Sequence, residues 1–381
     1  MIKQKICIIG GSLAGLVTAI SLSKLNCEID LIIGKDKKNP KSNITTAISE
    51  NNFNFLNRLN ISESIKKDAW SCSVMKLYTE DQNDKFSKIF ELDNNKEKNK
   101  ILYMLKNSKI TEQMVRKVKK IKSISVIKHK KISEIRNSGL LKSIKLNNLN
   151  HNYNLIIICA GNNSDLVKNI FSNHTIENSY KEISITTILK HDSIKNNIAR
   201  QIFLDEGIFA MLPISNIKTS VVWSIKKNKK KDTLFLKNKI KFYAKNYLKN
   251  ISFIANIESR NLNFLIREKY YKERILLFGD ALHVIHPFVG QGFNMILRDL
   301  LCLEKILSKK ISLGLDIGSS DILSEFSNEV KPRNFAFSIG VDFLKNSFSF
   351  KQLRNTSLKI LNKNNLIKNI FFNIANKGFR F

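Results

Sequence analysis

Two glycine-rich segments of this chain have a spacing suited to binding a phosphorylated or oxygen-rich ligand. The first, Gly10-Gly11-Ser12-Leu13-Ala14-Gly15, follows an apolar run and matches a GxGxxG pattern whose middle glycine is Ser12. In that pattern the first glycine permits a tight turn, the last allows close helix packing, and the helix N-terminus offers free N–H groups to a pyrophosphate. The segment predicts a dinucleotide-binding turn. A structural helix interrupted by glycines is the alternative.

An acid at the end of the next strand would complete this pattern by binding an adenosine ribose. That position holds Ile33-Gly34, and Asp36 is the nearest substitute.

The second segment, residues 274–299, combines a strand pattern, Gly279-Asp280, Pro287 and Gly290-Gln291-Gly292 at the start of a helix pattern. Its arrangement puts one carboxylate and one helix N-terminus on the same ligand. Asp280 can accept a hydrogen bond from a sugar-like hydroxyl, and the helix end can stabilise negative charge.

Three potential metal ligands also lie in this segment. Asp280, His283 and His286 follow one another at intervals of three, which on a helix would form a metal-binding face. Pro287 and the glycines after it favour a turn, and no further ligand cluster is evident, so we expect no metal site.

The elements around these segments predict an α/β fold. Apolar runs at residues 5–9 and 29–33 flank a helix pattern at 13–24, as in a βαβ unit, and strand patterns recur at 155–159 and 275–278. Residues 179–266 contain runs rich in β-branched and aromatic residues, which predict an antiparallel sheet. The lysine-rich run at 226–232 is expected to be a solvated hairpin loop, and residues beyond 292 are helical in pattern.

Composition bounds the class of protein. The chain has 381 residues, of which 43% are hydrophobic, and a formal net charge of +32. That charge suits nucleic acid, acidic ligands or an anionic membrane, but the excess is mostly lysine beside abundant Asn and Ile, as in AT-rich genomes. We therefore expect no nucleic-acid partner. Five scattered cysteines without a CxxC pair predict an intracellular protein without disulfides or zinc.

The second segment resembles a known family. It is similar to the GDAAHxxxPxxGQGxNxGxxD element of flavin-dependent aromatic hydroxylases, the class A flavin monooxygenases, and its stretch HPFVGQGFNMILRD resembles the ubiquinone-biosynthesis branch. The resemblance implies FAD as cofactor. Asp280 would bind the ribityl chain, Pro287 would lie beside the isoalloxazine, and its pyrimidine edge would face the backbone of Gly290, Gln291, Gly292, Phe293 and Asn294.

Other segments extend the resemblance over nearly the whole chain. Thr45-Thr46-Ala47-Ile48-Ser49 is similar to an RTTALS segment whose arginine is replaced by Ile44. Residues 207–213 and 220–223 look like the family's GPFALLP and SSVVW sheet segments, which cover the substrate. The implied substrate-binding residues are Met211, Pro213, Trp223 and Phe288.

One departure concerns the electron donor. The family's ADGxxS element is present as Cys159-Ala160-Gly161-Asn162-Asn163-Ser164, with Ala160 in place of the aspartate. Because that aspartate helps to bind nicotinamide, the donor is either NAD(P)H or a separate reductase or ferredoxin.

The function that the resemblance implies is hydroxylation of the aromatic ring of a polyprenylated phenol in ubiquinone biosynthesis, with O2 and a flavin C4a-hydroperoxide. His286 and Pro287 are the expected active-site residues. The alternative is a non-catalytic flavoprotein-like subunit that binds prenylated intermediates among other ubiquinone-biosynthesis proteins, motivated by Ser12, Ile33, Ile44 and Ala160.

The implied fold is a Rossmann-like FAD-binding domain, with a parallel sheet, interleaved with an antiparallel substrate-binding sheet. The expected boundaries are 1–75, 100–178 and 267–335 for the first domain, 76–99 and 179–266 for the second, and 336–381 for C-terminal helices. Residues 358–381 alternate apolar residues with Lys and Asn, which suits either an anionic bilayer or a core-facing helix with a basic side. We therefore expect a cytoplasmic protein that contacts the inner face of the cell membrane peripherally.

Overall fold

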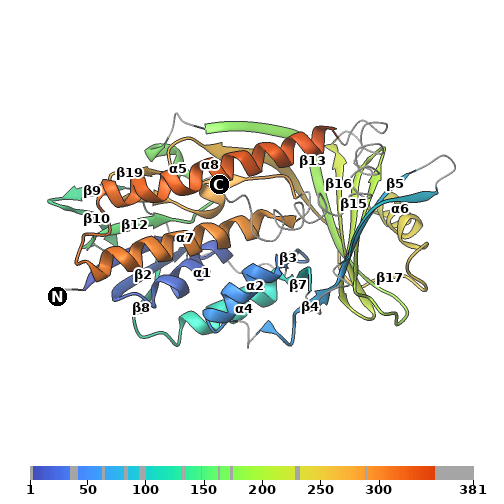
Figure 1. Ribbon diagram of the computed structural model, residues 1–381, viewed down its shortest axis with the longest axis horizontal. Coiled ribbons are helices and arrows are strands. Elements are labelled where there is room, and N and C mark those ends of the chain that lie inside the picture. Colours follow the sequence, from blue (N-terminus) through green and yellow to red (C-terminus); the bar gives the residue numbers. More distant parts are fainter. Residues whose placement is uncertain are drawn as a thin grey trace.

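A computed structural model describes residues 3–34, 42–61, 65–80, 85–93, 100–129, 132, 134–146, 148–161, 164–171, 175–227, 232–287 and 290–347. Figure 1 shows two lobes: one built on a parallel sheet with helices, the other on a large, mostly antiparallel sheet. The expected α/β architecture is therefore confirmed.

The parallel sheet forms the centre of the first lobe, with strand order β19-β20-β12-β1-β2-β8. All neighbours in it are parallel except β19 and β20. β1 lies between β12 and β2, so the chain leaves it toward one side of the sheet and later returns on the other, and ligands bind at such a switch point in α/β sheets. The bounds are β1 Gln4–Ile9, β2 Cys27–Gly34, β8 Ile124–His129, β12 Leu155–Ile158, β19 Tyr271–Lys272 and β20 Ile275–Leu277.

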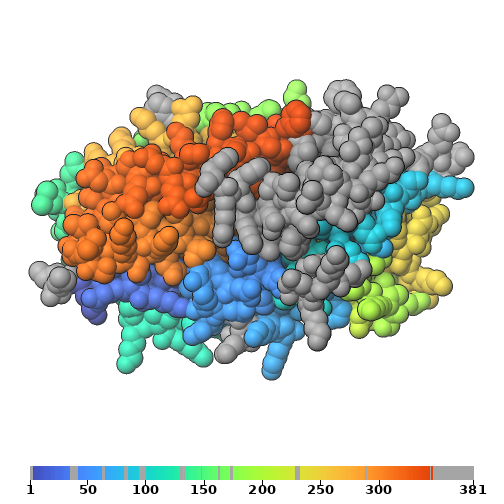
Figure 2. Space-filling view, in the orientation of Figure 1, coloured from blue at the N-terminus to red at the C-terminus, as the bar shows by residue number. Residues whose placement is uncertain are grey.

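Helices cover this sheet. The predicted βαβ unit is confirmed, because helix α1 joins the parallel strands β1 and β2 and is buried along nearly its whole length, as its apolar sequence requires. Helices α7 and α8 pack side by side, and Figure 2 shows them in orange next to α2 in blue. None of the helices in the described ranges is long and apolar enough to cross a membrane. The bounds are α1 Leu13–Leu22, α2 Glu50–Arg58, α4 Asn107–Val118, α5 Asp165–Ile170, α7 Gly292–Ser312 and α8 Ser320–Ser347.

The second lobe is a sheet in the order β21-β18-β13-β16-β15-β14-β5-β6, with β17 paired to β13. Its neighbours are antiparallel except β14 and β5. The bounds are β5 Val74–Glu80, β6 Phe86–Asp93, β13 Thr175–Lys190, β14 Ile198–Leu204, β15 Gly207–Ser215, β16 Lys218–Lys226, β17 Ser252–Phe253, β18 Glu258–Arg267 and β21 His283–Val284. β21 comes from the second glycine-rich segment and joins the two lobes. The domain boundaries stay a prediction.

One element was not expected. Helix α6 (Thr233–Ala244) follows β16, so the run at residues 226–232 connects a strand to a helix and the hairpin-loop prediction is wrong. Asp232 caps this helix by accepting a hydrogen bond from the Phe235 N–H at 2.7 Å, a typical start signal. Residues 228–231 lie outside the described ranges.

The large sheet has two faces, which we call outer and inner. Outer-face side chains such as Phe209 and Ile225 pack with Leu236 and Tyr243 of α6. Inner-face side chains turn to the first lobe, and they cluster with Ile285, Met295 and Ala47. Ala47 belongs to a small sheet of β3 Thr45–Ser49, β4 Trp70–Cys72 and β7 Leu102–Lys106; a second small sheet contains β9 Ile135–Ser138, β10 Leu141–Leu146 and β11 Leu149–Tyr153.

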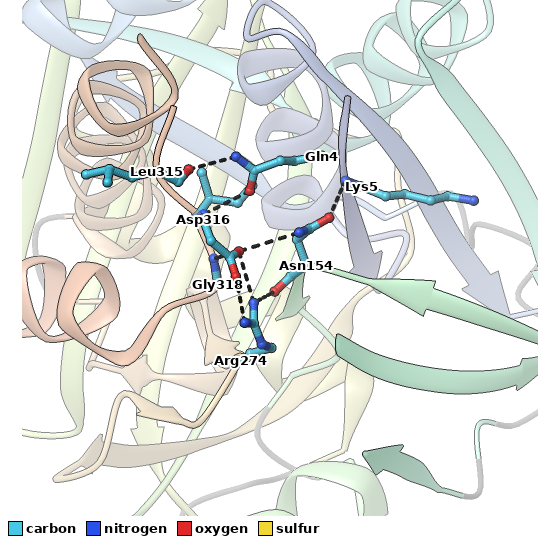
Figure 3. A network of polar contacts seen from close by, with 8 residues as sticks. Gln4, Lys5, Asn154, Arg274, Leu315, Asp316 and Gly318 are labelled. Atoms are coloured by element: carbon cyan, nitrogen blue, oxygen red, sulfur yellow. Dashed lines mark hydrogen bonds and ion pairs between the residues drawn. The ribbon is translucent and has the colours of Figure 1, made fainter. Parts of the chain in front are cut away.

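A polar network fixes the amino-terminal edge of the parallel sheet (Figure 3). Arg274, just before β20, donates to both carboxylate oxygens of Asp316, at 3.0 and 2.6 Å, and to the Asn154 carbonyl at 3.1 Å. Asn154 in turn accepts from the Lys5 N–H at 2.9 Å, and Gln4 exchanges hydrogen bonds with the backbone around Asp316. The α7–α8 connection is thereby tied to three strands.

This network predicts a pH-dependent contribution to stability. Partial burial would raise the pKa of Asp316, but the hydrogen bonds from Arg274 and the Gly318 N–H lower it. Because Asp316 is 40% exposed, screening limits the effect, and Asp316→Asn should cost about 1 kcal/mol of unfolding free energy near neutral pH. A carboxyl with a lowered folded-state pKa stabilises above its unfolded pKa and loses that effect as pH falls through the folded value. In denaturant titrations the gap between wild type and variant should therefore close below about pH 4; a gap that persists there would contradict the assignment.

Candidate active site

The first glycine-rich turn leaves no room for side chains. Gly10 has φ +127°, and a Cβ there would lie 2.6 Å from the Cys159 carbonyl oxygen. A Cβ on Gly15 would lie 1.9 Å from the Gly10 carbonyl oxygen, and one on Gly11 would lie 2.9 Å from Ile33. The turn is exposed at Gly11 and Ser12, and the Ser12 side chain makes no capping hydrogen bond to α1. The N-terminus of α1 is thus open to an anion, as the spacing predicts.

The second glycine-rich segment meets the first. Gly279 has φ +66°, and a Cβ on it would lie 2.7 Å from the Ala14 Cβ. Asp280 follows in a single 3-10 turn, Gly279–Ala281. The Asp280 side chain is exposed, yet desolvation by surrounding protein raises the pKa of its carboxyl, against the opposing effect of His283. The carboxylate is therefore exposed beside the α1 turn, where a ligand can reach it.

His283, which follows this turn, has a structural role. Its ring is buried, and its Nε2 lies 2.9 Å from Oδ2 of Asp299, which also accepts from Asn334 at 2.9 Å. The histidine and the last aspartate of the motif therefore bind each other and join α7, α8 and the turn. Sequence spacing gave no signal for this pair.

His286 is held by a different carboxylate. Its buried ring places Nε2 3.0 Å from Oε2 of Glu182, whose other oxygen lies 2.9 Å from Nζ of Lys345 on α8. Partial burial would raise the pKa of Glu182, but these two partners lower it. Glu182 follows an irregularity in β13 at which Lys181 has φ +52°. The geometry favours a positioning role for His286, and catalytic roles for His286 and Pro287 stay predictions.

The two histidines thus bind separate acids. In the described part of the chain no group of three or more His, Cys, Asp or Glu residues is arranged to hold a metal ion.

The start of α7 is clamped by Asn294. This buried side chain donates to the Ala47 carbonyl at 2.9 Å and accepts from the Ser49 N–H and from Asn52 at 2.9 and 2.8 Å. Its side chain is therefore occupied by β3 and α2, which leaves only its backbone for a ligand. No sequence motif marks Asn52, so its contact with Asn294 could not be predicted from the sequence.

Gln291, the N-cap residue of α7, differs from Asn294 because its side chain has unpaired polar atoms. Its side chain is 2% exposed, and neither its Nε2 nor its Oε1 has a hydrogen-bond partner in the structure. An unpaired amide that is buried costs free energy unless a ligand satisfies it. Gly290 beside it has φ +65° and Gly292 opens the helix, with Phe293 packed in the core behind. The backbone at these two glycines fits a polar ligand at the helix end, as FAD requires. Phe288 lies outside the described residues.

The substrate residues predicted on the large sheet lie on its outer face, and their role stays a prediction. Met211 and Trp223 are 2% and 1% exposed and pack on the outer face, where the Trp223 ring lies 5.7 Å from that of Tyr243. Pro213 lies two residues after Met211 on β15, so its side chain points to the same face of the sheet. Successive side chains of a strand point to opposite faces of the sheet. A resemblance that covers a whole segment therefore names side chains of the other face when the two sequences are matched one residue out of register. The inner face instead presents their neighbours Ala210, Leu212 and Val222.

This orientation predicts that Met211→Ala destabilises without affecting ligand binding. Removing a buried Met side chain should cost about 2–5 kcal/mol of unfolding free energy, measured by denaturant titration. The affinity for an aromatic ligand should stay within about twofold of wild type once the protein is folded. A matched Leu212→Ala change on the inner face should lower that affinity, and the reverse pattern would show that the faces are exchanged.

Comparison with known proteins agrees with this geometry. The family model described as FAD binding domain matches residues 3–335. The chain is 24% identical to the ubiquinone biosynthesis monooxygenase COQ6 of Dictyostelium discoideum over 334 residues, which covers 72% of this chain and 68% of that protein. It is 29% identical to the ubiquinone hydroxylase UbiL of Rhodospirillum rubrum over 176 residues, or 45% and 41% of the two chains.

Solved structures show the same fold. The p-nitrophenol 4-monooxygenase PnpA from Pseudomonas putida DLL-E4 superposes with a TM-score of 0.79 at 15% identity and covers 100% of this chain and 99% of its own. The resemblance to flavin-dependent hydroxylases is thus confirmed. Since the family model spans both glycine-rich segments and both lobes, the chain belongs to the FAD binding domain family.

Proposed function

We propose that this protein is an FAD-dependent monooxygenase that hydroxylates the aromatic ring of a polyprenylated phenol in ubiquinone biosynthesis. One observation carries the proposal: the Gly279 turn approaches α1 at Ala14, so one ligand would be able to contact both the α1 N-terminus and the Asp280 carboxylate. The names of the curated relatives support the pathway. The prenylated substrate and the route of oxygen transfer belong to this proposal.

The residues that would hold FAD form three groups. The N-terminus of α1 would bind the pyrophosphate, Asp280 would accept a hydrogen bond from the ribityl chain, and the start of α7 would face the pyrimidine edge. FAD, when bound, supplies the activation of O2 and the transfer of one oxygen atom. The residues concerned are Gly10, Gly11, Ser12, Ala14, Gly15, Asp280, Pro287, Gly290, Gln291, Gly292, Phe293 and Asn294.

The protein's own contribution would be to position the ring and exclude water. Glu182 and Lys345 fix His286, which in turn fixes the backbone at Pro287 beside the proposed ring site. The α7 N-terminus would stabilise negative charge through its unpaired N–H groups. The half-buried apolar side chains of the inner face would contact the substrate.

The proposed electron donor is NAD(P)H or a separate reductase or ferredoxin. Ala160 follows β12 and lies beside the Gly10 turn, and its methyl side chain offers no carboxylate there. Oxidation of NAD(P)H by the purified, FAD-loaded protein supports direct reduction, and activity that needs an added reductase or ferredoxin supports the other donor.

The proposed location is the cytoplasm, with peripheral contact to the inner face of the cell membrane, because a polyprenyl tail partitions into lipid. The formal charge of +32 would favour an anionic bilayer. The segment 358–381, proposed to contact lipid or the core, lies outside the described residues. Contact with other ubiquinone-biosynthesis proteins belongs to the same proposal.

Deletion of the gene with mass spectrometry of quinone precursors tests the function. Accumulation of a prenylated precursor that lacks one ring hydroxyl is the expected result. Unchanged quinone without an intermediate would refute the assignment. Purified protein that stays colourless with FAD, although the deletion strain lacks quinone, would favour a non-catalytic subunit that binds prenylated intermediates.

A further inference from the structure

Four side chains between the lobes are buried but have polar atoms without a hydrogen-bond partner. They are Thr45, Gln201, Ser220 and Gln291, with exposures of 7%, 5%, 0% and 2%, and the unpartnered atoms are Thr45 Oγ1, Gln201 Nε2, Ser220 Oγ and both amide atoms of Gln291. Buried polar groups in folded proteins are almost always paired, so four such side chains between two lobes require a physical explanation.

Two of the four lie on the inner face of the large sheet. Gln201 is paired with Ala210, and its neighbour Arg200 points the other way, with its guanidinium 5.1 Å from the Tyr247 ring on the outer face. Ser220 is paired with Leu212, and its neighbour Val221 packs on the outer face. Paired residues of antiparallel strands share a face, so Gln201 and Ser220 border the same apolar strip.

The other two come from the first lobe. Thr45 has the same parity on β3 as Ala47, which clusters with inner-face side chains. A Cβ on Gly290 would lie 3.4 Å from the Ala47 Cβ, so Gln291 follows a residue that touches the same strand. Thr45 and Gln291 therefore lie opposite the sheet rather than elsewhere in the fold.

The strip between these polar groups is apolar and reachable. Ala210, Leu212 and Val222 are half-buried, whereas Phe209 and Trp223 on the outer face are fully buried. All four unpartnered side chains are neutral. A carboxylate ligand would need a cationic partner that this set does not supply, whereas hydroxyl or methoxy oxygens need only neutral donors and acceptors.

We infer that Gln201 and Ser220, with Thr45 and Gln291 opposite them, form a subsite that binds the oxygen substituents of a neutral aromatic ring lying on Ala210, Leu212 and Val222. This deepens the proposed function and rests on it. Gln201 Nε2 donates to a ring oxygen, and the Ser220 hydroxyl donates or accepts according to the substituent. The site selects rings that carry neutral oxygens over rings that carry a carboxylate.

The experiment uses the full chain, with and without FAD, and titrates 2-methoxyphenol and 4-hydroxybenzoate by calorimetry. Ser220→Ala and Gln201→Met each remove one unpartnered group. We expect each change to raise the dissociation constant for 2-methoxyphenol about tenfold, without lowering the unfolding temperature, because the group it removes is unpaired in the free protein. Wild type should bind 4-hydroxybenzoate at least about tenfold more weakly than 2-methoxyphenol.

Ser338→Ala on α8 is the matched control, since Ser338 is likewise buried with an unpartnered hydroxyl but lies outside the subsite. It should leave the dissociation constant unchanged. Unchanged binding in both subsite variants, or preference for the carboxylate probe, would overturn the inference even if FAD binds normally. A lower unfolding temperature with both variants would show that the groups are structural and would also overturn it. Protein that binds 2-methoxyphenol through these residues but never FAD would refute the proposed function and leave the subsite standing.

Discussion

Asp280→Ala is expected to remove most of the FAD from the purified protein. The Asp280 carboxylate is exposed beside the glycine-rich α1 turn, which the Gly279 turn approaches at Ala14. A hydrogen bond to a charged group contributes about 1.5–3 kcal/mol, so its loss should weaken FAD binding roughly 10- to 100-fold. The flavin content after gel filtration and the dissociation constant from a fluorescence titration measure the effect.

Two further variants separate charge from geometry in this experiment. Asp280→Asn keeps an acceptor without the charge and should give an intermediate affinity. Asp205→Ala removes an exposed aspartate from the large sheet's β14–β15 turn, outside the proposed FAD site, and should retain full flavin. Equal flavin content in wild type and Asp280→Ala would remove the role given to this carboxylate.

The sequence predicts the first lobe better than the second, for a physical reason. The βαβ unit depends on local signals: buried apolar strands, an apolar helix, and glycines at Gly10 and Gly15 where a Cβ has no room. The pairs that organise the site are long-range. His286 and Glu182 are 104 residues apart and β21 joins β18 across the lobes, and no periodicity in the sequence encodes such contacts.

The large sheet illustrates the limit most clearly. Both of its faces are covered, one by α6 and one by the first lobe, so apolar residues occupy both parities of β15, as Phe209 and Leu212 do. Alternation identifies a face only where one side is polar. The resemblance identified the strands, but the residues that it named lie on the outer face, whereas the proposed ligand contacts lie on the inner face. The sequence does not reveal helix α6, because its aromatic and β-branched residues Phe235, Ile240, Phe242 and Tyr243 are as typical of strands as of helices.

Gly15→Ala is expected to have the largest effect of any conservative change in the first lobe. The added Cβ would lie 1.9 Å from the Gly10 carbonyl oxygen, which is a backbone atom held by the turn. To relieve this clash, α1 must move away from the turn. That movement disrupts the packing of α1 and distorts the proposed pyrophosphate site. Overpacking of this kind costs about 1–3 kcal/mol of unfolding free energy, and FAD should be lost as well.

A helical glycine elsewhere provides the control that isolates the close approach. A Cβ on Gly340 in α8 would meet no atom within 4 Å, so Gly340→Ala should raise the unfolding free energy by up to about 1 kcal/mol through helix propensity. Both variants make the same chemical change in a helix, and only Gly15 contacts the turn. Opposite signs in denaturant titrations, with flavin lost only from Gly15→Ala, are therefore the expected result. If both variants were equally stabilised, the α1 turn would be looser than the structure shows, and the glycine spacing would then reflect helix composition rather than a binding turn.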